Sequence, residues 1–363
     1  MSDGITTTNR VDGTTERILD AMVTDNILNT PTWGIRAIGM GKNFVGKSRD
    51  YTVKVSRTGQ GEWFSGMPAL NSSATDTTVT LSFRHAAYSH PIVIPIEEAM
   101  ANQGSAQTIP LIAFKSEEAH QECMADLGDV LHGTGSGDNP LGLGAIIDDG
   151  TSVGTIGGQS RTTYTALKAT RTASGGNLTL AKLATLFSAV SKGSRGGQEA
   201  PTVHVVTPTV FDLYEQLLHP SVRMNLDSQG YSMLPIRGNK VVKAGQLMGA
   251  AGFNVLSYRG VPVLADNYAT SGYWNMVNEN YIDWIGRSIV PAEFSGQLSK
   301  VNLGKAKTIE GQQMLPSNYN GIFMTKMNFH PDQPGAIKRL YVFGQLVGYN
   351  FRRQGVLTGI TGV

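Results

Sequence analysis

Residues 110–133 read PLIAFKSEEAHQECMADLGDVLHG and predict one long helix that ends in a glycine-rich turn. Apolar side chains recur along it mostly at intervals of three and four, which is the spacing of one helix face. They are Leu111, Phe114, Ala119, Cys123, Met124, Leu127, Val130 and Leu131. At about 1.5 Å per residue, the helix over residues 110–132 would be about 34 Å long, enough to cross a domain. We therefore expect one buried stripe on a helix around which the rest of the chain is arranged.

Both ends of this helix carry boundary signals. Thr108 can cap the first turn, and Pro110 stands where a missing backbone N–H costs nothing. Glu117 and Glu118 lie toward the N-terminal end, where the helix dipole is positive. At the other end Gly133 predicts a left-handed C-terminal cap, and the glycines that follow it stop the helix.

Length and composition bound the class of protein. A chain of 363 residues predicts two or three domains, or one elaborate domain with extensions. Only 16% of the residues are charged, whereas 40% are hydrophobic and 43 are glycine. A composition this poor in charge favours the subunit of an assembly over a free monomer. The net charge is +2 and no basic run resembles a nucleic-acid patch, which argues against sequence-specific DNA binding.

Cysteine usage and hydropathy limit the cellular context. The single Cys123 excludes an internal disulfide and gives no support to a zinc site. Because it lies on the apolar stripe, we interpret it as a buried structural thiol, with a reactive cysteine as the alternative. The N-terminal sequence MSDGITTTNRVDG has no secretion signal, and no apolar run approaches the length of a membrane span. We expect a cytoplasm-like compartment and no membrane contact.

The first part of the chain predicts an extended arm followed by two strands. Residues 1–40 are rich in Thr, Asn, Asp and Gly, with one short possible helix over residues 15–24. Alternation of apolar and polar side chains predicts strands over residues 51–56 and 78–84.

The connection between these strands, residues 57–77, is too long for an ordinary hairpin loop. Four large apolar side chains stand in it among glycines and polar residues: Trp63, Phe64, Met67 and Leu70. Exposing them on a loop tip is costly unless they dock on something. We therefore name these four residues as candidates for inter-subunit contacts, and we prefer a neighbouring subunit as the acceptor over a lid for a small ligand.

The remaining segments predict a body of mixed helices and strands. A strand is expected over residues 90–95, an apolar segment over 141–147, and loops or short strands over 148–176. Helices are expected over residues 180–192 and from Thr207-Pro208 to Pro220, on either side of a buried strand over 203–206. Further strands are expected over residues 253–257 and 261–264, joined at 258–260; over 273–277 and 281–285, joined at 278–280; and over 337–351.

Residues 41–48, GKNFVGKS, match the phosphate-binding pattern G-x-x-x-x-G-K-S in every position. Such a loop needs a buried strand before it and a helix after it, so that backbone N–H groups converge on the anion. Here an alternating strand follows, and residues 33–40 make a poor parallel core strand. We interpret Gly41 to Ser48 as a flexible glycine hinge between the arm and the hairpin, with nucleotide binding as the distant alternative.

Other chemistry finds no support in the sequence. The seven histidines include no pair at metal-ligand spacing with a third partner nearby, so we expect no metal. No nucleophile elbow occurs, and no Ser/His/Asp set stands out. We therefore expect no catalytic residues and no cofactor.

The order of these elements resembles the major capsid proteins of tailed phages, whose fold is named after the phage Hong Kong 97. The resemblance rests on the order and spacing of several segments and covers most of the chain from about residue 30 onward. These segments are 124–135 (MADLGDVLHGTG), 141–148 (LGLGAIID), 153–158 (VGTIGG), 205–213 (VVTPTVFDL), 258–266 (YRGVPVLAD) and 274–278 (WNMVN).

The resemblance implies an α+β fold with an N-terminal arm, an extended β-hairpin called the E-loop, a peripheral domain with a long spine helix, and an axial domain. It implies the following boundaries: arm, 1–41; E-loop, 42–90; peripheral domain with the spine helix, 91–140; axial domain, 141–290; and a return to peripheral β-structure with the C-terminal segment, 291–363. Some members begin with a fused, largely helical scaffolding region that this sequence lacks, so either the scaffold is a separate protein or the chain is the mature form.

The function that the resemblance implies is a non-enzymatic shell protein. Copies would form hexamers and pentamers of an icosahedral phage head that encloses double-stranded DNA, contacted non-specifically. Portal and scaffolding proteins are the expected partners, with a decoration protein as a further possibility, and the expected location is the virion after assembly in the host bacterial cytoplasm. The alternative within the fold is an encapsulin, the shell of a bacterial compartment, although encapsulins usually start with a helix and not with a polar arm.

Overall fold

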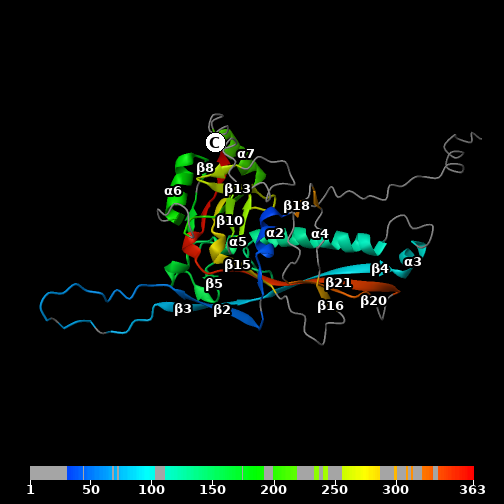
Figure 1. The fold of residues 1–363 in the computed structure, drawn as a ribbon, viewed down its shortest axis with the longest axis horizontal. Helices are drawn as coiled ribbons and strands as arrows, with labels where there is room; N and C mark the ends of the chain where they lie inside the picture. The colour runs from blue at the N-terminus through cyan, green and yellow to red at the C-terminus, as the bar shows by residue number, and fades with distance from the viewer. Residues whose placement is uncertain are drawn as a thin grey trace, which may run out of the picture.

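The structure, a computed structural model, describes residues 31–43, 45–67, 69–71, 73–102, 111–173, 175–191, 199–218, 233–236, 240–243, 256–286, 298–300, 308–309, 312–313, 321–329 and 334–363. The molecule is elongated: a long hairpin leaves the body at one end, and a helix with two long strands forms the other end (Figure 1). The expected helix over residues 15–24 and the expected cap at Thr108 lie outside the described residues, and so do residues 253–255 of one expected strand.

The long helix is present as α4 (Leu111–His132), which confirms its prediction. Its apolar stripe faces the core, where Ala119, Cys123, Leu127 and Leu131 are buried. Gly128 interrupts the stripe for a steric reason, because a Cβ atom there would lie 2.8 Å from both Pro31 and the ring of Tyr268. The absence of a side chain at Gly128 thus lets the segments that contain Pro31 and Tyr268 pack directly against α4.

The left-handed cap expected at Gly133 is wrong. The first residue beyond α4 with a positive φ is Gly135, at 73°. Gly133 instead donates its N–H to the carbonyl of Val130 at 3.1 Å, which tightens the last turn. Its carbonyl approaches Gly142, where a Cβ would lie 2.5 Å away. The glycines after α4 therefore allow the backbone to fold back onto the helix end and enter α5 (Leu143–Ile146), a short helix in the segment expected only to be apolar.

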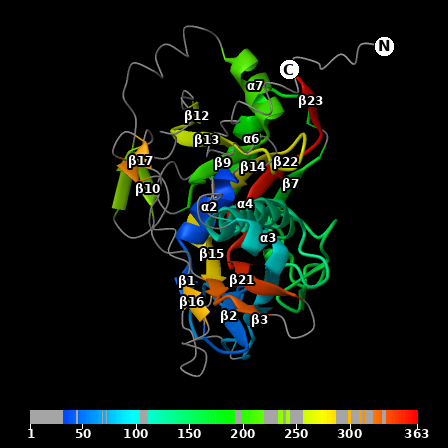
Figure 2. The same cartoon turned by 90° about the vertical axis from the view of Figure 1, so that its right-hand side faces the viewer.

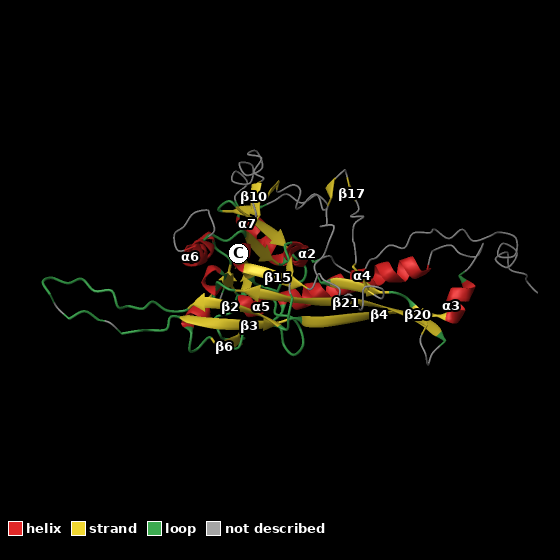
Figure 3. Ribbon diagram, turned by 60° about the horizontal axis from the view of Figure 1, so that its bottom comes forward, coloured by secondary structure: helices red, strands yellow, loops and turns green. Residues whose placement is uncertain are grey.

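The long strand β21 (Gly335–Gly348) is the centre of a seven-stranded sheet. It pairs antiparallel with β4 (Ala86–Pro95) along most of its length, and α4 packs against both strands. Five other strands complete the sheet. β15 (Ile282–Gly286), β19 (Ile322–Thr325) and β20 (Asn328–Phe329) pair with β21, with β15 and β19 on its two sides. At the edges, β16 (Leu298–Lys300) pairs with β19 and β1 (Lys42–Asn43) pairs with β15. The short helix α3 (Ile96–Ala101) follows β4 at the far end of this layer (Figures 1 and 3).

A six-stranded sheet forms the second layer (Figure 2). Its order is β12 (Ser257–Tyr258), β13 (Val261–Ala265), β9 (Val203–Val206), β14 (Trp274–Val277), β22 (Gly355–Leu357) and β7 (Thr170–Thr172). Helices α6 (Leu180–Ser191) and α7 (Pro208–Leu217) pack on this sheet, and Thr207 caps α7 as its sequence predicts. The turn from β12 to β13 uses positive φ angles at Arg259 and Gly260, as a two-residue hairpin requires.

Short pieces complete the described chain. The two-stranded pairs are β5 (Thr155–Ile156) with β6 (Gln159–Ser160), β8 (Gly176–Asn177) with β23 (Ile360–Gly362), β10 (Met233–Ile236) with β11 (Lys240–Lys243), and β17 (Thr308–Ile309) with β18 (Gln312–Gln313). Single 3-10 turns are η2 (Thr165–Leu167), η3 (Glu279–Tyr281) and η5 (Phe351–Arg353). Short strands over 148–176 are thereby confirmed.

Two expectations about local structure are corrected. Residues expected to form the end of an extended arm form helix α2 (Thr32–Gly39), with Trp33 and Ile38 each only 1% exposed. The strands joined at residues 278–280 are not a hairpin, because β14 lies in the six-stranded sheet and β15 in the seven-stranded one. The turn η3 carries the chain from one sheet to the other. Asn278 holds this turn in place: its side chain caps η3, and its backbone N–H donates to Gln354 at 2.8 Å.

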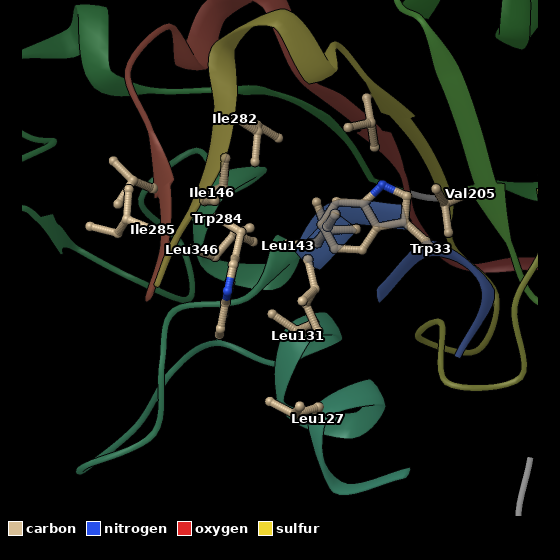
Figure 4. Close-up of a cluster of buried hydrophobic side chains, with 14 of the residues drawn as sticks. Trp33, Leu127, Leu131, Leu143, Ile146, Val205, Ile282, Trp284, Ile285 and Leu346 are labelled. Carbon is tan, nitrogen blue, oxygen red and sulfur yellow. The ribbon is translucent and has the colours of Figure 1, made fainter. Parts of the chain in front are cut away.

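The largest hydrophobic cluster lies where α2, α4, α5 and the seven-stranded sheet meet (Figure 4). Trp33 comes from α2, Leu127 and Leu131 from α4, and Trp284 from β15. Gly344 of β21 is necessary here, because a Cβ atom would lie 1.9 Å from the Trp284 ring. A second cluster lies between the six-stranded sheet and helices α6 and α7.

The stripe on α4 yields a first prediction. We expect Leu127→Asp to prevent soluble subunits from accumulating, because Leu127 is 6% exposed and a carboxylate there would lose its hydration at a cost of several kcal/mol. Glu122→Gln is the matched control, since Glu122 lies on the same helix with its side chain 45% exposed and should lose little stability. The measurement is the soluble fraction after expression, followed by a circular-dichroism melt. A soluble, folded Leu127→Asp protein would contradict the buried stripe.

Candidate inter-subunit surfaces

The predicted hairpin is formed by β2 (Ser48–Lys54) and β3 (Thr78–Arg84), which pair antiparallel from Ser48↔Arg84 to Lys54↔Thr78. The body holds its base firmly. Leu81 is fully buried, and the backbone of Ser82 donates to the carbonyl of Gly157 at 3.0 Å. Tyr51 stacks on Tyr349 of the body with ring centroids 5.6 Å apart.

Beyond this base, the described residues of 55–77 form a long loop whose far end stands clear of the body; we call this loop the tip (Figures 1 and 3). The backbone N–H of Val55 donates to the carbonyl of Thr77 at 2.9 Å, and further along the loop Gln60 donates to Ser73 at 3.2 Å. All four sequence-predicted contact residues lie on the tip and all are exposed: Trp63 by 104%, Phe64 by 61%, Met67 by 103% and Leu70 by 53%. Exposure of four large apolar side chains on one loop is typical of an interaction site.

A second apolar surface lies at the opposite end of the molecule, which sequence reasoning missed. It is a groove of about 540 Å³ between α3, the first turn of α4 and β20, and we call it the distal groove. Its walls are almost entirely apolar: Ile94, Ile96, Ala99, Met100, Leu111, Ile112, Met327, Phe329 and Ala336, with Asn102. Met100, Ile112 and Phe329 on its rim are exposed by 64%, 52% and 76%.

Helix α2 and β1 (Lys42–Asn43) are held in place by three acidic residues of the stretch 266–283. Asp266 accepts the backbone N–H of Trp33 at 2.8 Å, and His132 Nε2 of α4 lies 3.4 Å from it. Glu279 accepts two hydrogen bonds from Arg36, at 2.5 and 2.6 Å. We call this set of contacts the α2 clip.

The third contact of the clip joins Lys42 Nζ to Asp283 at 2.7 Å. Burial alone would lower the pKa of Arg36, but the charge of Glu279 and its hydrogen bonds raise that pKa above its ordinary value. Burial raises the pKa of Asp266, but His132 and the N–H donors of Trp33 and Tyr268 together bring it below its ordinary value. Asp266 therefore acts as an anion in the clip.

The phosphate-loop match at Gly41 to Ser48 lacks the required frame. Helix α2 precedes it, β1 pairs parallel with β15 inside it, and strand β2 follows it. The expectation of a flexible hinge is wrong at Gly41, which packs so tightly that a Cβ would lie 2.8 Å from Trp284. Lys42 is engaged by Asp283. No described helix begins directly after the loop, because β2 starts at Ser48, so the helix N-terminus that holds the anion in a phosphate loop is replaced by a strand.

Two buried titratable groups, Cys123 and His204, pack in the hydrophobic interior and are held in their neutral forms. Cys123 is fully buried, and burial with the nearby charge of Asp126 raises its thiol pKa to about 12, which keeps it unreactive. Burial lowers the pKa of His204 to about 3, so this imidazole is neutral among aromatic rings of the second core cluster. The described residues include no group of three His, Cys, Asp or Glu able to hold a metal ion. No described helix has the length and apolar character to cross a membrane.

Comparison with solved structures identifies the fold as that of tailed-phage major capsid proteins, the Hong Kong 97-like fold. The capsid asymmetric unit of cyanophage A-1(L) matches with a TM-score of 0.69 and 15% identity over 97% of this chain and 99% of that one. The capsid of the native GTA particle matches with a TM-score of 0.59 and 12% identity over 98% and 100% of the two chains.

An encapsulin shares the fold as well. The holo-SrpI encapsulin complex from Synechococcus elongatus PCC 7942 matches with a TM-score of 0.53 and 11% identity over 97% of this chain and 95% of that one. No model of a known protein family and no curated protein sequence matches the chain. At identities this low, the structural matches establish a shared fold alone. They cover 97% or 98% of this chain.

The Asp266 contacts predict a pH dependence. Because the folded-state pKa of Asp266 lies below its ordinary value of 3.8, its ionised form contributes fully to stability above about pH 5, and this contribution is lost as the pH falls through the lowered folded-state pKa. We expect Asp266→Asn to lower the free energy of unfolding by about 2 kcal/mol at neutral pH, and by progressively less toward about pH 3. Urea titrations at several pH values measure this; exposed Asp138→Asn is the control. A difference that grows toward acid pH would contradict the assignment.

The phosphate-loop match gives a further prediction. Lys47→Ala should leave assembly and any apparent ATP affinity unchanged, because Lys47 is exposed and stands before a strand in place of a helix. Equilibrium dialysis with labelled ATP provides the measurement. Saturable ATP binding that disappears in the variant would restore the nucleotide-binding alternative.

Proposed function

We propose that this chain is the major capsid protein of a tailed double-stranded DNA phage. Copies assemble into hexamers and pentamers of an icosahedral shell around the genome, and the protein catalyses no reaction. The observation that carries the proposal, beyond the fold, is the tip at the end of the long hairpin. Its large apolar side chains are exposed in the single chain, which is typical of a surface that another molecule covers.

The proposed acceptor for the tip is the distal groove of a second copy. The tip and the groove lie at opposite ends of the long axis, so the tip extends away from the groove of its own chain (Figures 1 and 3). Both surfaces carry large exposed hydrophobic side chains, and an aromatic anchor seated in an apolar pocket is typical of strong interface contacts. A contact between two different surfaces of identical chains is heterologous, and such contacts form a ring when the rotation from one copy to the next closes.

The proposed partners follow from a shell. Scaffolding and portal proteins would direct assembly, a decoration protein could cover the outside, and packaged DNA would be contacted without sequence preference. The protein would be assembled in the host bacterial cytoplasm and end in the virion.

The second candidate is an encapsulin, which the similarity to the SrpI shell favours. Negative-stain microscopy of the purified protein distinguishes a shell from a nucleotide-binding enzyme: closed particles support both shell candidates. Nuclease-protected double-stranded DNA in native particles would then support the phage head, whereas protein cargo without DNA would support the compartment.

The tip yields a sharper prediction. Trp63→Ser with Phe64→Ser should leave the thermal unfolding of the isolated subunit almost unchanged, since both side chains are exposed within one chain. Assembly should fail or give fragile particles, because each aromatic anchor contributes about 2 kcal/mol or more and the loss repeats at every contact. Sedimentation beside a circular-dichroism melt is the measurement.

The control and the groove variant complete this test. Val45→Ser removes an exposed apolar side chain outside the tip and should leave assembly intact. Phe329→Ser on the groove rim should reproduce the assembly defect of the tip variant without lowering the melting temperature. Intact shells together with a melting midpoint lowered by many degrees would mean that the tip packs on its own subunit, and the E-loop assignment would be withdrawn.

A further inference from the structure

A second groove, distinct from the distal groove, lies at the neck of the hairpin. It has a volume of about 750 Å³ and runs between residues 52–57 of the hairpin, η2, and residues 349–352 of the body; we call it the neck groove. Among the described residues that line it, all the charged ones are cations: Lys54, Arg57 and Arg352. All three side chains are exposed. The groove therefore favours an anionic occupant.

The aromatic residues of the neck groove are already engaged. Tyr349 stacks on Tyr51 and meets Tyr281 edge to face, with ring centroids 5.9 Å apart. The guanidinium of Arg161 lies over the ring of Phe351 at 5.4 Å. Proteins that bind single-stranded nucleic acid use open aromatic faces on which bases stack. The neck groove offers cations beside apolar walls instead, which suits an acidic peptide with apolar side chains better than a nucleic acid.

The sequence itself contains such a peptide. Residues 1–30 carry more carboxylates than cations: Asp3, Asp12, Glu16, Asp20 and Asp25 against Arg10 and Arg17. The rest of the chain has the opposite balance, because the whole chain has 30 Lys and Arg against 28 Asp and Glu. Apolar side chains that can fill a groove lie among these carboxylates: Ile18, Leu19, Met22 and Val23.

The connection allows this segment to bind its own body. Residues 1–30 are followed directly by Pro31, which packs against α4 at Gly128. Thirty residues span at most about 100 Å when extended. Because the segment is covalently attached, its effective concentration around its own chain is on the order of millimolar. Binding within one chain is thus favoured over binding between chains in dilute solution.

We propose that, in the unassembled subunit, the acidic N-terminal segment of residues 1–30 binds in the neck groove of its own chain. Its carboxylates pair with Lys54, Arg57 and Arg352, and its apolar side chains cover the aliphatic and aromatic walls. The contact holds the segment at the neck of the hairpin. This inference stands apart from the shell function, because it concerns the isolated subunit.

Site-specific photo-crosslinking in the full chain tests the proposal. A benzophenone amino acid replaces Ser56, an exposed residue of the groove, and in a control protein it replaces Gln121, an exposed residue of α4. Subunits freed of particles by sedimentation are irradiated, digested and analysed by mass spectrometry. We expect cross-links from position 56 to peptides of residues 1–30, and none from position 121.

Two further measurements make the outcome decisive. An equal mixture of light and ¹⁵N-labelled subunits should yield cross-links only between peptides of the same label, and tenfold dilution should not change their yield. The triple variant Lys54→Glu, Arg57→Glu and Arg352→Glu should lower the yield about tenfold, and adding Glu16→Lys, Asp20→Lys and Asp25→Lys should restore it. High salt should also lower the yield, because the Debye length is only about 3 Å at 1 M.

Several results would overturn the proposal. These are cross-links from position 56 to other segments of the chain or to nucleic acid, mixed-label cross-links, or a yield that charge reversal leaves unchanged. The absence of any cross-link would also overturn it. Circular-dichroism melts of the charge variants exclude unfolding as the cause of a lost signal. Particle formation is scored separately by microscopy, so failure of this inference and failure of the shell assignment give different results.

Discussion

The packing of α4 along β4 and β21 is the constraint on which the rest of the structure depends. Strand β21 pairs with four other strands, and the helix covers it with a stripe of buried side chains. Close approach is possible only because of glycines at the contacts: Gly344 leaves room for the Trp284 ring, and Gly128 leaves room for Pro31. A methyl group at either site would separate layers that are packed to interior density.

The α2 clip extends this rigid layer to the hairpin. Asp266 follows the six-stranded sheet, Asp283 belongs to the seven-stranded one, and Glu279 lies between them, so α2 and β1 bridge both sheets. Buried charges are costly unless each is paired, and here each carboxylate has a donor within about 3 Å. Since β2 begins a few residues after β1, the clip also determines the direction in which the hairpin leaves the body.

Periodicity predicted the elements that are long or buried on both faces. The helix at residues 111–132 and the strands at 78–84 and 203–206 lie where the sequence predicts them. Helix α2 was missed because Gly34 and Gly39 weaken its local signal, and its stability comes from distant partners such as Asp266 and Glu279. The turn at residues 278–280 resembles a hairpin connection, and only tertiary contacts send the next strand to the other sheet.

The contrast between local sequence pattern and tertiary contact also explains which candidate surface could be predicted from the sequence. The tip residues were visible in the sequence because large apolar side chains interrupt a polar loop, whereas the distal groove is assembled from separate segments that share no local pattern. The stacking of Tyr51 on Tyr349 restrains the neck of the hairpin against the body. Between Val55 and Thr77 the described loop residues form no strand. In the proposed shell, hexamers and pentamers demand two angles between neighbours, and this loop can absorb the difference while the neck and the clip keep their geometry.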